Sequence, residues 1–169
     1  MDVAKQKAKE NPALLKNGFV VLATHQTAGR GTKNREWYSQ SQGGLYYTFV
    51  CNPSSLKAEC AQEYQLSIAL CIKSLIDSIF NVSCTIKYPN DIFLNNKKLA
   101  GILLETSSKS NVPFFDYFSI GIGINLNQKK FPSQLQTIAT STYIETQKKI
   151  SNTTLAKALT DKLVLALNL

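Results

Sequence analysis

The stretch "KYPNDIFLNNKKLAGILLE", residues 87–105, decides the fold because it predicts two strands around a short polar turn. The apolar runs "DIFL" and "LAGILLET" flank "NNKK", which is the pattern of a β-hairpin. Pro89 fixes a turn between this hairpin and a short strand at 84–88. Asn90 and Asp91 are suited to cap the local backbone. The stretch therefore predicts neighbouring antiparallel strands.

The second strand of the hairpin has one face that could serve a ligand. Side chains alternate along a strand, so Gly101, Leu103 and Glu105 share a face, and Lys98 directly precedes that strand. An ordinary hairpin with solvated lysines would show the same pattern, and we keep that interpretation for Lys97. For Lys98 the residues alone leave both interpretations open.

A further strand is predicted at 114–127, "FFDYFSIGIGINLN", and its two faces differ. Isoleucine and leucine side chains form the apolar face, whereas Gly121, Gly123, Asn125 and Asn127 share the other. A face without side chains lets something bulky lie against the backbone. That bulky group is either a packed helix or a ligand to which Asn125 offers its amide, and the residues do not decide between them.

The remaining segments predict helices at both ends of the chain with strands between them. The first helix is expected over 2–15, and the last begins at Ser151 or Asn152. Apolar spacing predicts another helix from about Cys60 to Phe80. This order is typical of an α+β fold with a mixed, mostly antiparallel central sheet and flanking helices. The other expected features are a buried strand at 18–24, a strand at 43–50, an irregular segment at 128–150, and Leu155, Leu159, Leu163 and Leu167 as the inner face of the last helix.

Length and composition indicate one ordinary globular domain. The chain has 169 residues, of which 44% are apolar and 18% are charged. No apolar run reaches the length of a membrane span, and the polar N-terminal segment is unlike a signal peptide. The four cysteines lack CxxC or metal-ligand spacing, so we expect reduced core thiols and a cytoplasmic protein.

The formal net charge of +8 indicates an anionic partner. Nucleic acid, an anionic small substrate and an acidic protein would each fit this charge. The basic residues are scattered, with neither a basic helix nor a base-stacking aromatic motif, so nucleic acid is the least favoured of the three.

A long polar loop at 25–42 contains "GRGTKNREW", residues 29–37, and its length predicts a functional role. Glycine-rich turns present successive backbone amides to an anion. Arg30 and Arg35 add guanidinium groups that bind carboxylate or phosphate in a bidentate manner. Trp37 can cover an apolar or planar part of a ligand. The loop lacks the P-loop lysine pattern, and no helix follows it directly, which argues against a Rossmann turn.

Together, "QTAGRGTKNREW", "KYPNDIFLNNKKLAGILLE" and "GIGIN" resemble the catalytic domain of biotin–protein ligases in their order and separation. That family shows Q-T-x-G-R-G-R-x-x-R-x-W, then K-W-P-N-D with K-x-A-G-I-L-x-E, then G-x-G-x-N. The resemblance implies a single biotin/lipoyl ligase-like catalytic domain over residues 1–169. It implies that ATP and biotin, with Mg²⁺, give biotinyl-5′-AMP and pyrophosphate. Biotin then passes to a lysine of a biotin carboxyl carrier domain.

The resemblance also assigns roles to individual residues. Lys98 is implied to bridge the biotin carboxylate and the phosphate, and Arg30 to close over the adenylate, so these two are the expected catalytic residues. Gln26 is implied to line the biotin site and Trp37 to shield the adenylate, whereas metal ligands are left unassigned. The expected binding residues for biotin and biotinyl-AMP are Gln26, Gly29, Arg30, Gly31, Thr32, Lys33, Arg35, Trp37, Lys98, Gly101 and Asn125.

Several departures from the family pattern bear on function. Thr32 stands where the second arginine of G-R-G-R is usual, so we expect the intermediate to be held less tightly, with Lys33 available to compensate. Tyr88 replaces the usual tryptophan and keeps an aromatic ring. The domain is also expected to lack the family's first strand with its Ser/Thr-Thr-Asn turn, an N-terminal DNA-binding domain and a C-terminal β-barrel.

Two alternatives stay open. A lipoate or octanoate–protein ligase or transferase of the same superfamily would share the fold. A truncated, non-catalytic biotin-binding protein would share the pocket. Apart from the carrier, we expect neither nucleic acid nor a membrane as a partner, and the sequence leaves a homodimer open.

Overall fold

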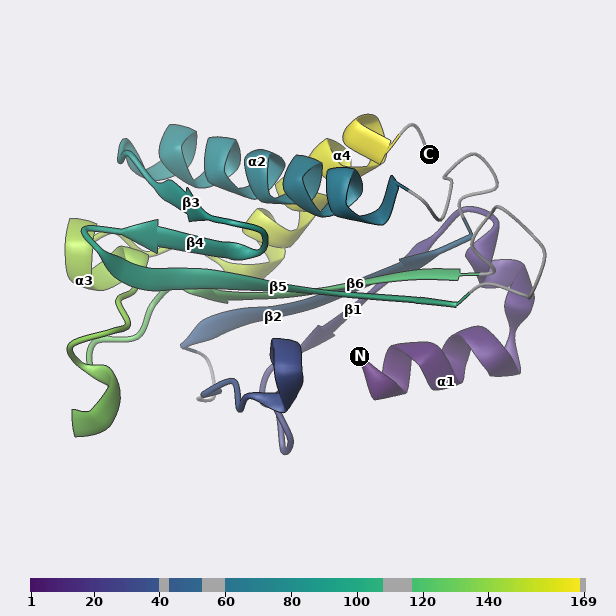
Figure 1. Ribbon diagram of the computed structural model, residues 1–169, viewed down its shortest axis with the longest axis horizontal. Coiled ribbons are helices and arrows are strands. Elements are labelled where there is room, and N and C mark those ends of the chain that lie inside the picture. The colour runs from purple at the N-terminus through teal and green to yellow at the C-terminus, as the bar shows by residue number, and fades with distance from the viewer. Residues whose placement is uncertain (40–42, 53–59, 108–116, 168–169) are drawn as a thin grey trace.

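Six strands form one sheet in the computed structural model, which describes residues 1–39, 43–52, 60–107 and 117–167 (Figure 1). The strands lie in the order β1-β2-β6-β5-β4-β3, and each neighbouring pair is antiparallel. The parallel pairing in this part of the chain is an isolated bridge between Lys98 and Ala139. The predicted α+β fold with a mostly antiparallel sheet is therefore confirmed. The bounds are β1 Phe19–Ala23, β2 Gly44–Cys51, β3 Thr85–Lys87, β4 Asp91–Leu94, β5 Lys97–Ser107 and β6 Tyr117–Asn125.

Helices lie on both faces of the sheet (Figure 1). α2 (Ala61–Phe80) and α4 (Asn152–Leu167) cover one face, and α1 (Asp2–Glu10) lies against the other. The main core lies between the sheet and the first two of these helices, and it contains the isoleucine face of β6 and the inner leucines of α4. The glycine face of β6 is consequently left to the side of the sheet on which α1 lies.

The β4–β5 hairpin turns through two residues only. Asn95 and Asn96 have φ angles of 50° and 62°, the left-handed region that two-residue hairpin turns require and asparagine tolerates. The turn predicted as "NNKK" therefore consists of Asn95 and Asn96 alone. Lys97 and Lys98 already belong to β5.

A β-bulge in β5 decides where Lys98 points. Phe93 pairs with Lys98 and Ile92 pairs with Ala100, so Leu99 is an extra residue in the second strand. Leu99 and Ala100 are both fully buried in the core. Strict alternation would put Lys98 on the face opposite Gly101, but the bulge brings both onto the same face.

The first helix and first strand differ from expectation. The helix ends at Glu10, and Pro12 begins a separate 3-10 turn, η1 (Pro12–Leu15), because proline cannot continue an α-helical hydrogen-bond ladder. The strand predicted as buried is β1, which lies at the sheet edge and leaves Leu22 42% exposed.

The segment predicted to be irregular, 128–150, contains two short helices, η4 (Ser133–Leu135) and α3 (Thr142–Thr146). The start of the strand predicted at 114–127 and the end of the loop predicted at 25–42 fall outside the described residues. Within the described part of the chain, no helix has the length and apolar character that crossing a membrane requires.

Candidate active site

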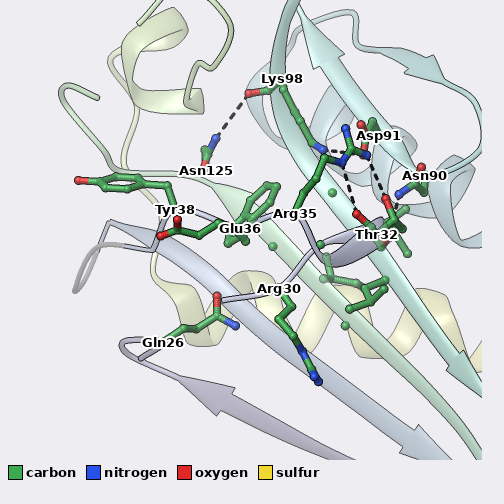
Figure 2. A pocket seen from close by; sticks show the side chains of 18 of the residues that line it. Gln26, Arg30, Thr32, Arg35, Glu36, Tyr38, Asn90, Asp91, Lys98 and Asn125 are labelled. Atoms are coloured by element: carbon green, nitrogen blue, oxygen red, sulfur yellow. Dashed lines mark hydrogen bonds and ion pairs between the residues drawn. The ribbon is translucent and has the colours of Figure 1, made fainter. Parts of the chain in front are cut away.

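A cavity of about 270 Å³ lies on the α1 side of the sheet, between β5 and β6 and the loop that follows β1 (Figure 2). Most of the residues predicted to bind the ligand line it, whereas Gly29 and Lys33 do not. The lining also includes Phe131, Leu135, Ile138 and Ala139, from a segment to which the sequence patterns gave no role. The predicted residues in the lining are Gln26, Arg30, Gly31, Thr32, Arg35, Trp37, Lys98, Gly101 and Asn125.

Glycines form the floor of the cavity. Gly101 of β5 pairs with Gly123 of β6, so two positions without side chains lie next to each other. A Cβ atom on Gly101 would stand 2.8 Å from Cζ3 of Trp37, and one on Gly123 would stand 2.5 Å from Cε2 of the same ring. The bulky group on the glycine face is thus the indole of Trp37. A ligand can reach this floor only after the indole moves.

The loop over the cavity is itself a small hairpin. The Gly31 N–H donates to the Arg35 carbonyl at 2.7 Å, and the Trp37 N–H donates to the Gly29 carbonyl at 2.9 Å. Lys33 lies in the turn of this hairpin, with a left-handed φ of 57°. These two amides are already bonded within the loop, so they do not form the open anion-binding nest that the glycines suggested.

A lysine–aspartate pair lies over the floor. The Lys98 Nζ atom lies 2.7 Å from Asp91 Oδ1 and 5.4 Å from the centroid of the Trp37 ring. Asn90 holds the end of β4 in place, because its side-chain amide donates to the Ile102 carbonyl and its own carbonyl accepts from the Ile102 N–H. Lys98 therefore points into the cavity. An anionic ligand that binds its ammonium group would have to compete with Asp91.

The two arginines of the loop have different partners. Arg35 donates to the Thr32 hydroxyl at 3.0 Å and to the Thr32 carbonyl at 3.3 Å. Arg30 pairs with Asp2 at 2.6 Å and lies 3.9 Å from Glu105. Figure 2 shows Arg35 and Lys98 pointing toward the same end of the cavity, whereas Arg30 points away from them. The hydroxyl and carbonyl of Thr32 thus hold the guanidinium of Arg35 in place.

Asn125 is oriented by a buried partner. Gln128 is 2% exposed and donates from its side chain to Asn125 Oδ1 at 3.1 Å. The Asn125 amide nitrogen in turn faces the Lys98 carbonyl at 3.5 Å. No sequence pattern indicated Gln128, because its contact with Asn125 depends on how the chain returns after β6.

Apart from Asp91 Oδ1, which pairs with Lys98, two buried polar atoms of the cavity lining lack a hydrogen-bond partner among the described residues. They are the acceptor Gln26 Oε1 and the donor Trp37 Nε1. Buried polar groups are seldom left unpaired. The arrangement therefore fits a ligand that carries both an N–H donor and an acceptor oxygen.

The cysteines lie apart from this cavity, and none of the four forms a disulfide. Burial raises the pKa of the Cys51 thiol to about 12. Burial, together with a hydrogen bond to Asp77, also raises the pKa of the Cys84 thiol to about 12. Cys51 and Cys84 are therefore the buried core thiols that the sequence predicted, whereas Cys60 and Cys71 are only partly buried.

A family model described as the biotin/lipoate A/B protein ligase family matches residues 2–125, and this chain belongs to that family. The match runs from α1 to the end of β6, so it includes the glycine-rich loop, the bulged hairpin and the glycine floor.

Individual relatives agree with this assignment. The chain is 38% identical over 112 residues to a biotin–[acetyl-CoA-carboxylase] ligase from Paracoccus denitrificans, which covers 63% of this chain and 43% of that protein. The biotin protein ligase from Aquifex aeolicus in complex with biotin and ATP matches with a TM-score of 0.77 and 31% identity, over 88% of this chain and 60% of that chain. The Leishmania major ligase in complex with biotinyl-5-AMP matches with a TM-score of 0.80 and 28% identity, over 99% and 70%. This chain therefore spans less than half the length of curated relatives such as the Paracoccus ligase.

Proposed function

We propose that this chain is an ATP-dependent biotin–protein ligase. It forms biotinyl-5′-AMP and transfers biotin to a lysine of a biotin carboxyl carrier domain. The observation that carries the proposal is the position of Lys98, whose ammonium group lies over a floor of glycines beside Trp37. The relatives named above are biotin ligases, which supports biotin over lipoate as the acid.

The first half-reaction must bring two negative groups together. A carboxylate oxygen of biotin attacks the α-phosphorus of ATP, a new O–P bond forms, and the bond to the departing pyrophosphate breaks. A fixed cation at this point lowers the barrier, because it stabilises charge that concentrates in the transition state. We assign this role to Lys98. Arg35 supplies a second positive charge at the same end of the cavity.

Arg30 has a separate role in this proposal. Its guanidinium is 45% exposed and paired with Asp2, which is 73% exposed. Ion pairs between exposed groups are weak, so a phosphate can replace Asp2 at modest cost. We propose that Arg30 exchanges Asp2 for the adenylate when the loop closes over the intermediate.

The bicyclic ring of biotin fits an unpaired acceptor of the cavity. Its ureido group carries N–H donors, one of which can bind Gln26 Oε1. We place the ring near the glycine floor, in space that the indole of Trp37 now occupies. Once displaced, the same indole can cover the adenylate and keep water from its reactive carbonyl.

In the second half-reaction the carrier lysine must reach that carbonyl as a free amine. Its nitrogen forms a C–N bond with the biotinyl carbon, the bond to phosphate breaks, and AMP leaves with its electron pair while the amine loses a proton. Asn125, held by Gln128 at 3.1 Å, is available to donate to the adenylate from the edge of the floor.

Magnesium is expected to enter with the nucleotide. This ion usually binds through substrate phosphates and water with one or two carboxylates. The described residues contain no group of three or more side chains that could hold a metal ion. Asp91, the carboxylate that faces Lys98, is already paired with it at 2.7 Å. We therefore assign no protein ligand to the ion and no step to it.

We also propose that the reaction takes place in the cytoplasm. The four cysteines, none of which is in a disulfide, support this location, since disulfides are rare there.

Exchange of labelled pyrophosphate into ATP tests the proposal and its rivals in one assay. We expect exchange that depends on biotin and not on lipoate. Exchange that depends on lipoate instead would favour a lipoate ligase. Biotin binding without exchange would favour the non-catalytic alternative.

A further inference from the structure

A second surface, rich in lysine, adjoins the cavity and takes part in none of the steps above. We call it the lysine rim and define it as Lys97, Lys129, Lys130 and Lys149. Three of these lysines line a separate hollow of about 250 Å³, namely Lys97, Lys129 and Lys130. Phe131 and Ala139 line both this hollow and the main cavity, so the two share a wall.

The rim lies around α3, at the end of the sheet where β4 turns into β5 (Figure 1). Tyr143 of α3 is its centre, because the Nζ atoms of Lys129 and Lys149 lie 6.0 Å and 5.7 Å from the centroid of its ring. Cation–π attraction of this kind holds ammonium groups near an aromatic face. Lys97 is fixed separately by a hydrogen bond to the Gln136 carbonyl at 3.0 Å.

Carboxylates in the described part of the chain do not neutralise the rim. Within the described residues, no rim lysine forms an ion pair with aspartate or glutamate. Glu145 of α3 lies nearby, but its two oxygens accept hydrogen bonds from Asn95 at 2.6 Å and Thr140 at 2.5 Å. The rim is therefore a fixed patch of positive charge beside the cavity.

Apolar side chains are exposed next to these lysines. Ile138, in the wall of the main cavity, is 57% exposed, and Ile144, in the wall of the second hollow, is 37% exposed. Cations that share a surface with exposed isoleucines suit a folded protein partner, which brings carboxylates and apolar groups together. A nucleic acid would engage the lysines through phosphates and leave the isoleucines uncovered.

We infer that the lysine rim docks an acidic face of the carrier domain. The inference rests on the proposed function. When the acceptor lysine of the carrier domain enters the cavity, the carrier surface around that lysine must lie over the wall that the cavity and the rim share. Charge complementarity at such a surface raises the rate of encounter and fixes the orientation of the partner. The rim therefore affects transfer to a carrier protein and has no part in formation of the adenylate.

Two charge-matched triple variants test this inference. The rim variant carries Lys129→Glu, Lys130→Glu and Lys149→Glu, and the control variant carries Lys7→Glu, Lys9→Glu and Lys157→Glu on α1 and α4. Each variant lowers the net charge of +8 by the same six units, two for each reversal, so they differ in where the charge changes. Measurements on each are the rate of biotinyl-AMP formation, kcat/KM for an acidic biotin carboxyl carrier domain, and transfer to hydroxylamine.

We expect the rim variant to lose about 10- to 100-fold in kcat/KM for the carrier domain at low salt, with a smaller loss at high salt. Adenylate formation and transfer to hydroxylamine should match the parent protein, because neither involves docking. The control variant should stay within about threefold of the parent in every assay. Equal losses in the two variants, or no loss in the rim variant, would overturn the inference while leaving the proposed function intact.

Two further results would count against the rim as a carrier site. Loss of binding to duplex DNA in the rim variant, with normal carrier kinetics, would assign the surface to nucleic acid. Failure of the parent protein to form biotinyl-AMP would overturn the proposed function and this inference with it. Normal adenylate formation in the parent separates the two kinds of failure.

Discussion

The floor of the cavity and the loop above it are built in different ways. The floor is backbone: Gly101 and Gly123 are paired strand residues, and the bulge residue Leu99 and its neighbour Ala100 are buried in the core. The loop is held by three backbone hydrogen bonds and by side chains such as Arg30, whose partner Asp2 is largely exposed. The floor therefore supplies fixed geometry, whereas the loop supplies contacts that a ligand can replace.

The largest expected effect follows from the residue that the bulge places over the floor. Lys98→Ala should reduce the rate of biotinyl-AMP formation by at least about a hundredfold, which is the cost of removing one group that stabilises charge in a transition state. Circular dichroism should show an unchanged fold. Lys97→Ala is the matched control, since its amine contacts the Gln136 carbonyl outside the main cavity. A Lys98 variant that forms adenylate at the rate of the parent would remove Lys98 from the mechanism.

A methyl group on the floor should have the next largest effect. In Gly123→Ala the new Cβ would stand 2.5 Å from Trp37, so the indole must leave the floor and the ring of biotin would meet the same obstacle. We expect a red shift of tryptophan emission and a loss of biotin affinity of about tenfold or more. Gly31→Ala in the loop would place its Cβ 3.5 Å from the nearest neighbouring atom, an ordinary contact, and should leave the emission unchanged. Equal spectra for the two variants would show that Trp37 does not rest on the floor.

A moderate effect is expected from Thr32, because it anchors Arg35 in the loop. Thr32→Val keeps the shape of the side chain but removes the hydroxyl that accepts from Arg35 at 3.0 Å. Release of biotinyl-AMP into solution should then speed up by about three- to tenfold, the value of one hydrogen bond. Thr32→Arg should slow release by adding a second charged contact to the phosphate. The adenylate found free in solution after one turnover without carrier gives the comparison, and equal amounts from all three proteins would make Thr32 a neutral variation.

The smallest expected effect concerns Asp77 of α2, on the other face of the sheet. It tests the stability of the fold and not the active site. Burial by itself would raise the pKa of Asp77, but hydrogen bonds from Lys73 and from the Cys84 N–H outweigh it and lower the pKa below its ordinary value of 3.8. The charged form is therefore favoured in the folded state. Its contribution is present above about pH 4 and is lost as the pH falls through the lowered pKa.

Asp77→Asn should accordingly lower the free energy of unfolding by about 1 kcal/mol at pH 7, and the difference from the parent should shrink as the pH falls below 4. Urea unfolding across this pH range measures it. Asp161→Asn, an exposed position on α4, should change the free energy by less than about 0.5 kcal/mol. A difference between parent and Asp77→Asn that stays constant down to pH 2 would mean that the pKa of Asp77 is not lowered.

Much of the cavity floor could be predicted from local patterns in the sequence. Alternation in "GIGIN" predicted a face with Gly121, Gly123 and Asn125, and "NNKK" between apolar runs predicted the hairpin. Both patterns depend on neighbours in sequence, which is why they could be interpreted without a structure. Alternation alone would not have put Lys98 on the glycine face, because a bulge depends on which residues of the partner strand lie opposite.

The contacts of the loop and the cavity wall formed by Phe131 and Ile138 were harder to predict from the sequence. The glycines predicted an open nest of amides, but pairing within the loop uses the N–H groups of Gly31 and Trp37. The contact between Arg30 and Asp2 joins segments 28 residues apart and leaves no local pattern. Phe131 and Ile138 come from a segment with no periodicity at all, so their place in the cavity wall depends on tertiary packing.

The most direct test of the proposed reaction is mass-spectrometric detection of biotinyl-5′-AMP. The protein is incubated with biotin, ATP and magnesium in the absence of carrier, beside its Lys98→Ala variant, and the products are quantified. We expect one equivalent of biotinyl-5′-AMP bound to the parent protein, with pyrophosphate released, and no detectable adenylate from the variant. Equal adenylate from both proteins, or none from the parent although biotin binds to it, would contradict the proposed reaction.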